Sequence, residues 1–130
     1  MKNIKLGLII AAGILLVAAC APAPVLNISK APVQTVSGHK ASLDEVGNAI
    51  TRAGVALGWQ MQTVKPGNIV GTLNLRGHTA VVDITYDTKT YSITYKDSTN
   101  LKYNGEKIHK NYNSWIQNLD RDIRAQLSTL

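Results

Sequence analysis

Few side chains in this sequence combine the residue types and spacings that chemistry requires. The 130-residue chain contains one cysteine, Cys20, and three histidines, His39, His78 and His109. The histidines lie far apart, and none has a cysteine or carboxylate partner at the spacing of a metal site. We therefore expect no metal and no cofactor. The sequence also lacks a glycine-rich phosphate loop and a nucleophile with a neighbouring base, so we predict that the protein is not an enzyme.

One hydrolytic alternative stays open, in which His109 meets an acid such as Asp83 or Glu106. A general acid or base has to lie within hydrogen-bond reach of the group that it serves. This alternative therefore requires a fold that brings these residues together.

Cys20 stands directly after an export-type N-terminal segment. Lys2 and Lys5 give this segment a positive start, and residues 6–17 are an uninterrupted apolar run. A helix of this length spans about 18 Å, which is too short for a bilayer core of about 30 Å. The length and the flanking residues are typical of a signal peptide, which we assign to residues 1–19.

The residues around the expected cleavage site, Val17-Ala18-Ala19-Cys20, resemble the lipobox of bacterial lipoproteins. The resemblance implies that signal peptidase II recognises Val17, Ala18 and Ala19 and cuts before Cys20. It also implies that the Cys20 thiol receives diacylglycerol and that the new amino terminus is acylated. The alternative is an ordinary signal peptide, cut after an Ala-x-Ala site at residues 21–23.

The resemblance also gives the protein an address. Two or three acyl chains hold a protein on a membrane far more firmly than one chain does. Ala21, rather than an aspartate, follows Cys20, and by resemblance to enterobacterial sorting this favours the inner leaflet of the outer membrane, facing the periplasm. The periplasmic face of the inner membrane and the cell surface are the alternatives.

Composition narrows the class of partner. Removal of Lys2 and Lys5 with the signal lowers the net charge of the chain from +6 to +4. The remaining basic residues are scattered, without the long runs of one charge that interaction tails carry. Because export also separates the protein from nucleic acid, we expect as partners the membrane, through the acyl chains on Cys20, and an envelope protein.

Residues 20–41 are predicted to be the lipidated N-terminus followed by a flexible tether. Three prolines in this range oppose helix and sheet hydrogen bonding. A short edge strand made from residues 25–28 and 33–36 is the alternative for part of it.

Residues 42–130 are predicted to form one α+β domain. Ser42 and Glu45 match a capping box at the start of a helix that ends before Gly58. Segments of alternating polarity separated by turns then predict an antiparallel meander, and a helical stripe follows. The meander strands are expected at 59–64, 69–76, 79–86 and 90–96, and the last helix from about 105–108 to 127. The prediction is a two-layer sandwich of order α-β-β-β-β-α, with a four-stranded sheet and both helices on one of its faces.

The most distinctive motif lies at the start of the last helix. Residues 108–119 read I-H-x-N-Y-N-x-W-I-x-x-L. Together with the lipobox, this motif resembles a signature of a family of small, uncharacterised proteobacterial lipoproteins. The resemblance covers about the last third of the chain, and it implies a fold and an address but no reaction.

Two interpretations of this segment compete. In the first, its apolar residues are core, while its histidine and asparagines cap the helix and hold it to the meander. In the second, Tyr103, His109 and Asn113 form a binding patch, because aromatic rings and amides together offer stacking and hydrogen bonds to a glycan or peptide. The threonine-rich outer face of the sheet is another possible docking surface for a protein.

These observations favour a membrane-anchored, non-enzymatic envelope accessory domain that binds a protein. The alternative is a small-ligand or cell-wall glycan binding module that uses residues 109–115.

Overall fold

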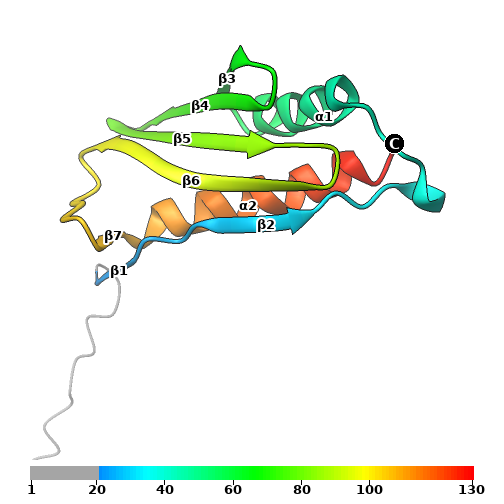
Figure 1. Ribbon diagram of the computed structural model, residues 1–130. Coiled ribbons are helices and arrows are strands. Elements are labelled where there is room, and N and C mark those ends of the chain that lie inside the picture. Colours follow the sequence, from blue (N-terminus) through cyan, green and yellow to red (C-terminus); the bar gives the residue numbers. More distant parts are fainter. Residues whose placement is uncertain (1–20) are drawn as a thin grey trace, which may run out of the picture.

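The computed structural model describes residues 21–130, which form an α+β domain (Figure 1). A five-stranded antiparallel sheet and two helices make its two layers, and a second sheet of two short strands lies at one end. The predicted signal peptide 1–19 and the predicted lipidation site Cys20 lie outside the described residues, as do Val17, Ala18 and Ala19.

The predicted four-stranded meander is present, but the sheet is larger. Its order is β2-β6-β5-β4-β3, and every neighbouring pair is antiparallel. The prediction of four strands is therefore wrong by one, because β2 extends the meander at β6. The strands are β2 (Ile28–Pro32), β3 (Gln60–Lys65), β4 (Asn68–Leu75), β5 (His78–Tyr86) and β6 (Thr90–Thr99).

Helix α1 (Leu43–Ala56) begins at the predicted capping box. The Ser42 hydroxyl accepts from the Glu45 backbone N–H, and the Glu45 carboxylate accepts from the Ser42 backbone N–H, both at 3.1 Å. Two orphan backbone donors are thus satisfied at the positive end of the helix. Gly58, with φ +89°, follows the helix in the left-handed conformation that glycine adopts easily.

The core lies between the two helices and one face of the sheet. Alternate residues of β4, β5 and β6 are buried, and so is the apolar stripe of each helix. Since α1 and α2 also pack on each other, both helices cover the same sheet face (Figure 1). The largest fully buried side chains are Tyr91, Tyr112, Ile50, Ile69, Ile84, Ile93, Leu101, Ile108, Ile116, Leu119, Ile123 and Leu127.

Two glycines of α1 allow this helix to lie close to the sheet. The space that a side chain on Gly54 would need is occupied by the Met61 side chain from β3. The corresponding space at Gly47 is occupied by the ring and hydroxyl of Tyr86 from β5. A larger residue at either position has to displace its neighbour, so these glycines set the distance between the two layers.

The prediction of a flexible tether over residues 20–41 is wrong for its described part, residues 21–41. In β2, Ile28 pairs with Ile93 and Ala31 pairs with Tyr91 of β6, and Ala31 is only 5% exposed. A bulge between Ile28 and Ala31 breaks the two-residue period, which is why the sequence pattern hides the strand. A short 3-10 turn, η1 (Val36–Gly38), then leads toward α1.

The last helix, α2 (Lys110–Leu127), starts later than the 105–108 predicted for it. Residues before it are extended, because β7 (Lys107–His109) pairs with β1 (Pro22–Pro24) in the small second sheet. The backbone N–H of Val25 also donates to the Glu106 carbonyl at 3.0 Å. These inter-strand bonds hold the chain extended where periodicity alone suggested helix. Within residues 21–130, no helix is long and apolar enough to cross a membrane.

Candidate functional site

The three residues of the predicted patch contact different neighbours. Tyr103 stacks on Tyr95, with ring centroids 4.2 Å apart, whereas the His109 ring lies near His78. Asn113 is hydrogen-bonded to the backbone around β1. Each side chain is therefore engaged by the fold itself, in a separate interaction.

Asn113 uses both halves of its amide within the protein. Its Oδ1 accepts from the Leu26 N–H at 2.9 Å, and its Nδ2 donates to the Pro24 carbonyl at 2.8 Å. Asn113 lies in the first turn of α2. The side chain thus links the start of the helix to the N-terminal segment, and not to the meander as the first interpretation expected.

His109 caps α2, as the first interpretation predicted. Its Nδ1 accepts from the Asn111 N–H at 3.1 Å, which satisfies one of the free donors of the first helical turn. On its other side the His109 ring stacks near His78 at a centroid distance of 6.4 Å, and His78 lies at the same distance from Trp115. No sequence pattern predicts that the two histidines lie side by side, because they belong to different elements.

The hydrogen bonds of these histidines determine their chemistry. His78 Nδ1 lies 2.7 Å from the Asn100 carbonyl, so it carries the proton. His109 Nδ1 accepts a bond, so its proton is on Nε2 in the neutral ring. A metal bound to Nδ1 of His109 would therefore take the electron pair that caps α2. A metal bound to Nε2 would require that nitrogen to lose its proton. Among residues 21–130, no group of three or more histidine, cysteine or acidic side chains is placed to hold a metal ion.

Tyr103, Tyr95 and Tyr112 form a row of rings that leads from the surface into the core. Tyr103 is 42% exposed, and Tyr95 packs edge-on against the buried Tyr112 at 5.7 Å. The Tyr112 hydroxyl is buried without a hydrogen-bond partner among the described residues. Burial therefore raises the pKa of Tyr112. An open hollow of about 620 Å³ lies along Tyr95 and Tyr103.

The hydrolytic alternative has no support in these contacts. The Asp83 carboxylate lies 3.4 Å from the Lys96 ammonium, and the aromatic ring beside His109 is that of His78. The Glu106 backbone bonds to Val25 and Asn104, and among the described residues its carboxylate forms no ion pair with His109.

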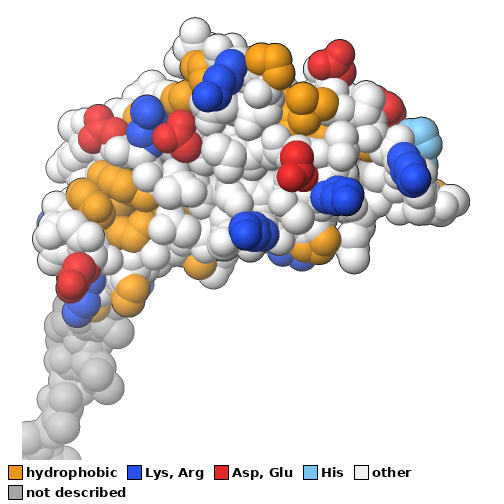
Figure 2. All heavy atoms as spheres, in the orientation of Figure 1, with side chains coloured by type: hydrophobic (Ala, Val, Ile, Leu, Met, Phe, Trp, Pro, Cys, Tyr) orange, Lys and Arg blue, Asp and Glu red, His pale blue; other side chains and the backbone are white. Residues whose placement is uncertain are grey.

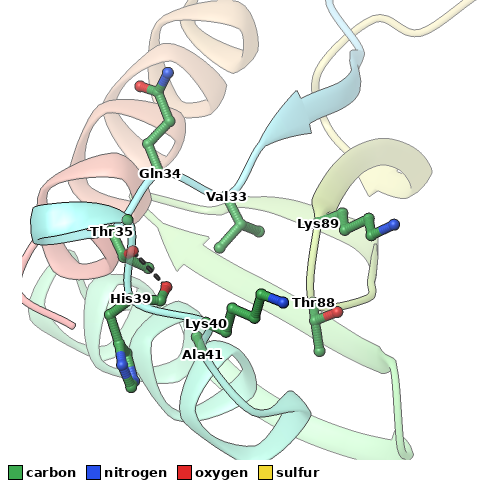
Figure 3. Close-up of a pocket in the computed structure, with 9 residues that line it drawn as sticks. Val33, Gln34, Thr35, His39, Lys40, Ala41, Thr88 and Lys89 are labelled. Carbon is green, nitrogen blue, oxygen red and sulfur yellow. Dashed lines mark hydrogen bonds between the residues drawn. The ribbon is translucent and has the colours of Figure 1, made fainter.

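A larger hollow than the one along Tyr95 and Tyr103 lies at the other end of the domain, around η1 (Figure 3). It is open, with a volume of about 710 Å³, and the Lys40 side chain extends across it toward Thr88. The Thr35 hydroxyl donates to the His39 carbonyl at 2.6 Å and closes the η1 turn. His39 itself lies 3.6 Å from Glu45 in an exposed pair. This hollow is therefore solvated and basic, and an exposed ion pair such as His39–Glu45 adds little to the free energy of unfolding.

The helix-free face of the sheet is polar. Figure 2 shows charged side chains of both signs scattered over this face, with the largest group of hydrophobic side chains toward the end where the described chain begins. Its exposed or half-buried positions are Thr72, Asn74, Asp83, Thr85, Thr90, Ser92 and Thr94. The predicted wet, threonine-rich outer face is thus confirmed.

The two edges of the sheet differ. The β2 edge carries a bulge, a left-handed Lys30 with φ +49° and Pro32, three features that oppose pairing with another strand. The β3 edge pairs regularly with β4 from Gln60 to Thr63, and its outer side meets no further strand among the described residues. Val64 of β3 is 51% exposed. The register of β3 shifts between Thr63 and Lys65, so residues 60–63 are the part of the two edges that has the form of a strand-addition site.

Comparison with known proteins gave no relative: no protein-family model, no curated protein and no solved structure matches the chain. The resemblance to proteobacterial lipoproteins therefore stays a prediction from the residues.

Proposed function

We propose that the protein belongs to the small proteobacterial lipoproteins that its motifs resemble, and that it is a non-enzymatic accessory domain which binds an envelope protein. Acyl chains on Cys20 anchor it to the inner leaflet of the outer membrane, where the domain faces the periplasm. The Val17-Ala18-Ala19-Cys20 sequence supports the anchor. The periplasmic face of the inner membrane and the cell surface remain the alternative addresses.

The open β3 edge is the observation that supports protein binding. Strand addition satisfies the free backbone groups of an edge and adds side-chain contacts at alternate positions. β3 offers an exposed strand with few charges, in which only Lys65 at its end is charged. We therefore propose that the partner adds an extended segment beside residues 60–63, where β3 is regular.

The glycan alternative has less support. A glycan would need free hydrogen-bonding groups beside an aromatic ring. Both halves of the Asn113 amide are already bonded, and His109 Nδ1 caps α2. Tyr103 retains an exposed ring beside a hollow, so it is the one residue of the predicted patch that offers a free aromatic surface.

Site-specific photocrosslinking in cells tests the β3 proposal. A photoreactive residue replaces Gln62 on β3 in the full-length protein. The control protein carries the same residue in place of Lys30 on β2, and both positions are exposed. We expect one defined adduct from position 62 only, with the crosslink mapped by mass spectrometry to an extended segment of the partner.

The variant Val64→Lys provides the second arm, since an edge lysine opposes strand addition. The adduct at position 62 should then disappear while the protein remains folded. The same adducts at positions 62 and 30, or none at 62 under several growth conditions, would contradict the proposal.

A further inference from the structure

The β1 end of the domain lies very close to the predicted lipid anchor. β1 begins at Pro22, two residues after Cys20. Two extended residues span about 7 Å, so acylation at Cys20 would leave almost no slack between the bilayer and the folded protein. The long tether expected from the sequence would have let the domain lie at many distances from the bilayer. This short connection instead holds the domain in contact with the bilayer surface.

The segment that follows the anchor position is fixed to the domain at several points. Pro22, Ala23 and Pro24 pair with β7, and the Val25 N–H donates to the Glu106 carbonyl. Asn113 then binds the backbone on both sides of Val25. A segment held in this way transmits the position of the anchor to the orientation of the whole domain.

The surface beside this segment has the composition of a membrane-contacting face. We define the β1-end surface as Lys102, Tyr103, Lys107 and Lys110, all exposed and all on the loop, strand and helix start that adjoin β1 (Figure 1). Glu106 is the one acidic residue among residues 100–112. No ion pair among the described residues involves these three lysines.

We propose that the β1-end surface rests on an anionic phospholipid surface, with the three lysines at the headgroups and Tyr103 at the interface. This inference depends on the proposed acylation of Cys20. Lysines near an anionic bilayer are attracted to it, and tyrosine rings favour the interface. The family-type motif then has a physical role, because Ile108, His109 and Asn113 hold the chain that carries the anchor.

Lysine footprinting of the acylated, full-length protein tests the orientation. The protein is extracted from membranes and placed in vesicles of phosphatidylglycerol and phosphatidylethanolamine, in phosphatidylcholine vesicles, and in neutral detergent. A soluble amine-reactive reagent then labels exposed lysines. On the anionic vesicles we expect Lys102, Lys107 and Lys110 to react at least threefold more slowly than in detergent, whereas Lys40, Lys65 and Lys89 keep their rates.

The variant Asn113→Ala should reduce this protection while acylation persists, and Asn111→Ala, at an exposed position without a side-chain bond, should not. Equal slowing of both lysine groups on the anionic vesicles, or none, overturns the orientation. Intact mass separates the two proposals: an unmodified cysteine or another start site refutes the anchor, whereas an acylated protein with uniform labelling refutes only the orientation.

Discussion

The two edge strands of the sheet come from segments that differ in sequence and in burial. β2 comes from the proline-containing N-terminal stretch, is bulged, and buries Ala31 against the core. β3 follows a well-formed helix, pairs regularly with β4 from Gln60 to Thr63 before its register shifts, and leaves five of its six residues exposed. The segment that resembles a linker is thus integrated into the domain, while the segment that resembles an ordinary strand borders solvent.

This difference indicates that the β2 edge and the β3 edge have different roles. An edge closed by a bulge, a proline and a lysine protects the domain from unwanted pairing, and the same segment connects to the predicted anchor. The opposite edge is left free. Variants that act on one edge and spare the other therefore test whether the two edges have these separate roles.

The largest expected effect comes from charge on the β2 edge. Ala31→Asp places a carboxylate at a position that is 5% exposed, and we expect it to lower the free energy of unfolding by about 3 kcal/mol or more. Val64→Asp on the β3 edge, where the residue is 51% exposed, should change it by less than about 0.5 kcal/mol. Urea denaturation of both variants measures the contrast.

Equal costs for the two substitutions would mean that β2 is no more a part of the core than β3 is. Ala31→Ser serves as the size-matched control, since its hydroxyl costs less to bury than a charge. It should fall between the wild type and Ala31→Asp.

The sequence predicts those parts of the fold in which polar and apolar residues repeat with the period of a strand or of a helix. The meander strands, the capping box at Ser42 and the stripe of the last helix are confirmed, although the register shifts after Thr63 in β3 and between Val81 and Val82 where β5 pairs with β6. The sequence predicts a tether over β2 because three prolines lie in residues 20–41, and the bulge between Ile28 and Ala31 further obscures the alternation of the strand. Local periodicity also placed residues 105–108 in helix, where pairing with β1 holds β7 extended.

The candidate site was less predictable than the fold. The composition of the motif indicated that Tyr103, His109 and Asn113 are unusual, but composition does not say what an amide binds. The partners of Asn113 lie 87 and 89 residues away in sequence. The stacking of His78 on His109 likewise depends on how β5 and β7 meet, and no short-range signal reports that meeting.

An intermediate effect is expected from loss of the link between α2 and the N-terminal segment. Asn113→Ala leaves the Leu26 N–H and the Pro24 carbonyl without their partner, which should cost about 2 kcal/mol. Hydrogen exchange should show faster exchange at residues 25–31 than at β3 or β4. Asn111→Ala is the control, and a uniform increase over the whole sheet would contradict a role confined to the β2 side.

A smaller effect separates two buried tyrosines near that side. The Tyr91 hydroxyl donates to Asp120 at 2.5 Å, whereas the Tyr112 hydroxyl has no partner among the described residues. Tyr91→Phe should therefore cost about 1–2 kcal/mol, and Tyr112→Phe should be neutral or stabilising. Thermal or urea unfolding decides between them, and a larger cost at Tyr112 would show that its hydroxyl is paired in solution.

Tyr91 also predicts how the β2 side responds to alkali. Burial, followed by the bond to Asp120, raises the pKa of Tyr91, so folding favours the protonated phenol. Its contribution is fully present below the unfolded pKa of about 10 and is lost as pH rises above it. The stability difference between wild type and Tyr91→Phe should accordingly shrink above pH 10, and a constant difference would contradict this account.

The smallest effect concerns the cap of α1, the helix that covers the inner side of β3. The Ser42 backbone N–H, above all, lowers the pKa of Glu45 below 4.5, and His39 at 3.6 Å adds to the shift. A lowered folded pKa means that the carboxylate stabilises the fold above the unfolded pKa, and that this contribution is lost as pH falls through the folded value. Glu45→Gln should therefore be slightly less stable than wild type at pH 6, and the two should converge below pH 4.5. Ser42→Ala removes the cap itself and should cost about 1 kcal/mol at pH 6. If the difference between wild type and Glu45→Gln grew on acidification, the Glu45 charge would be opposing the helix instead of supporting it.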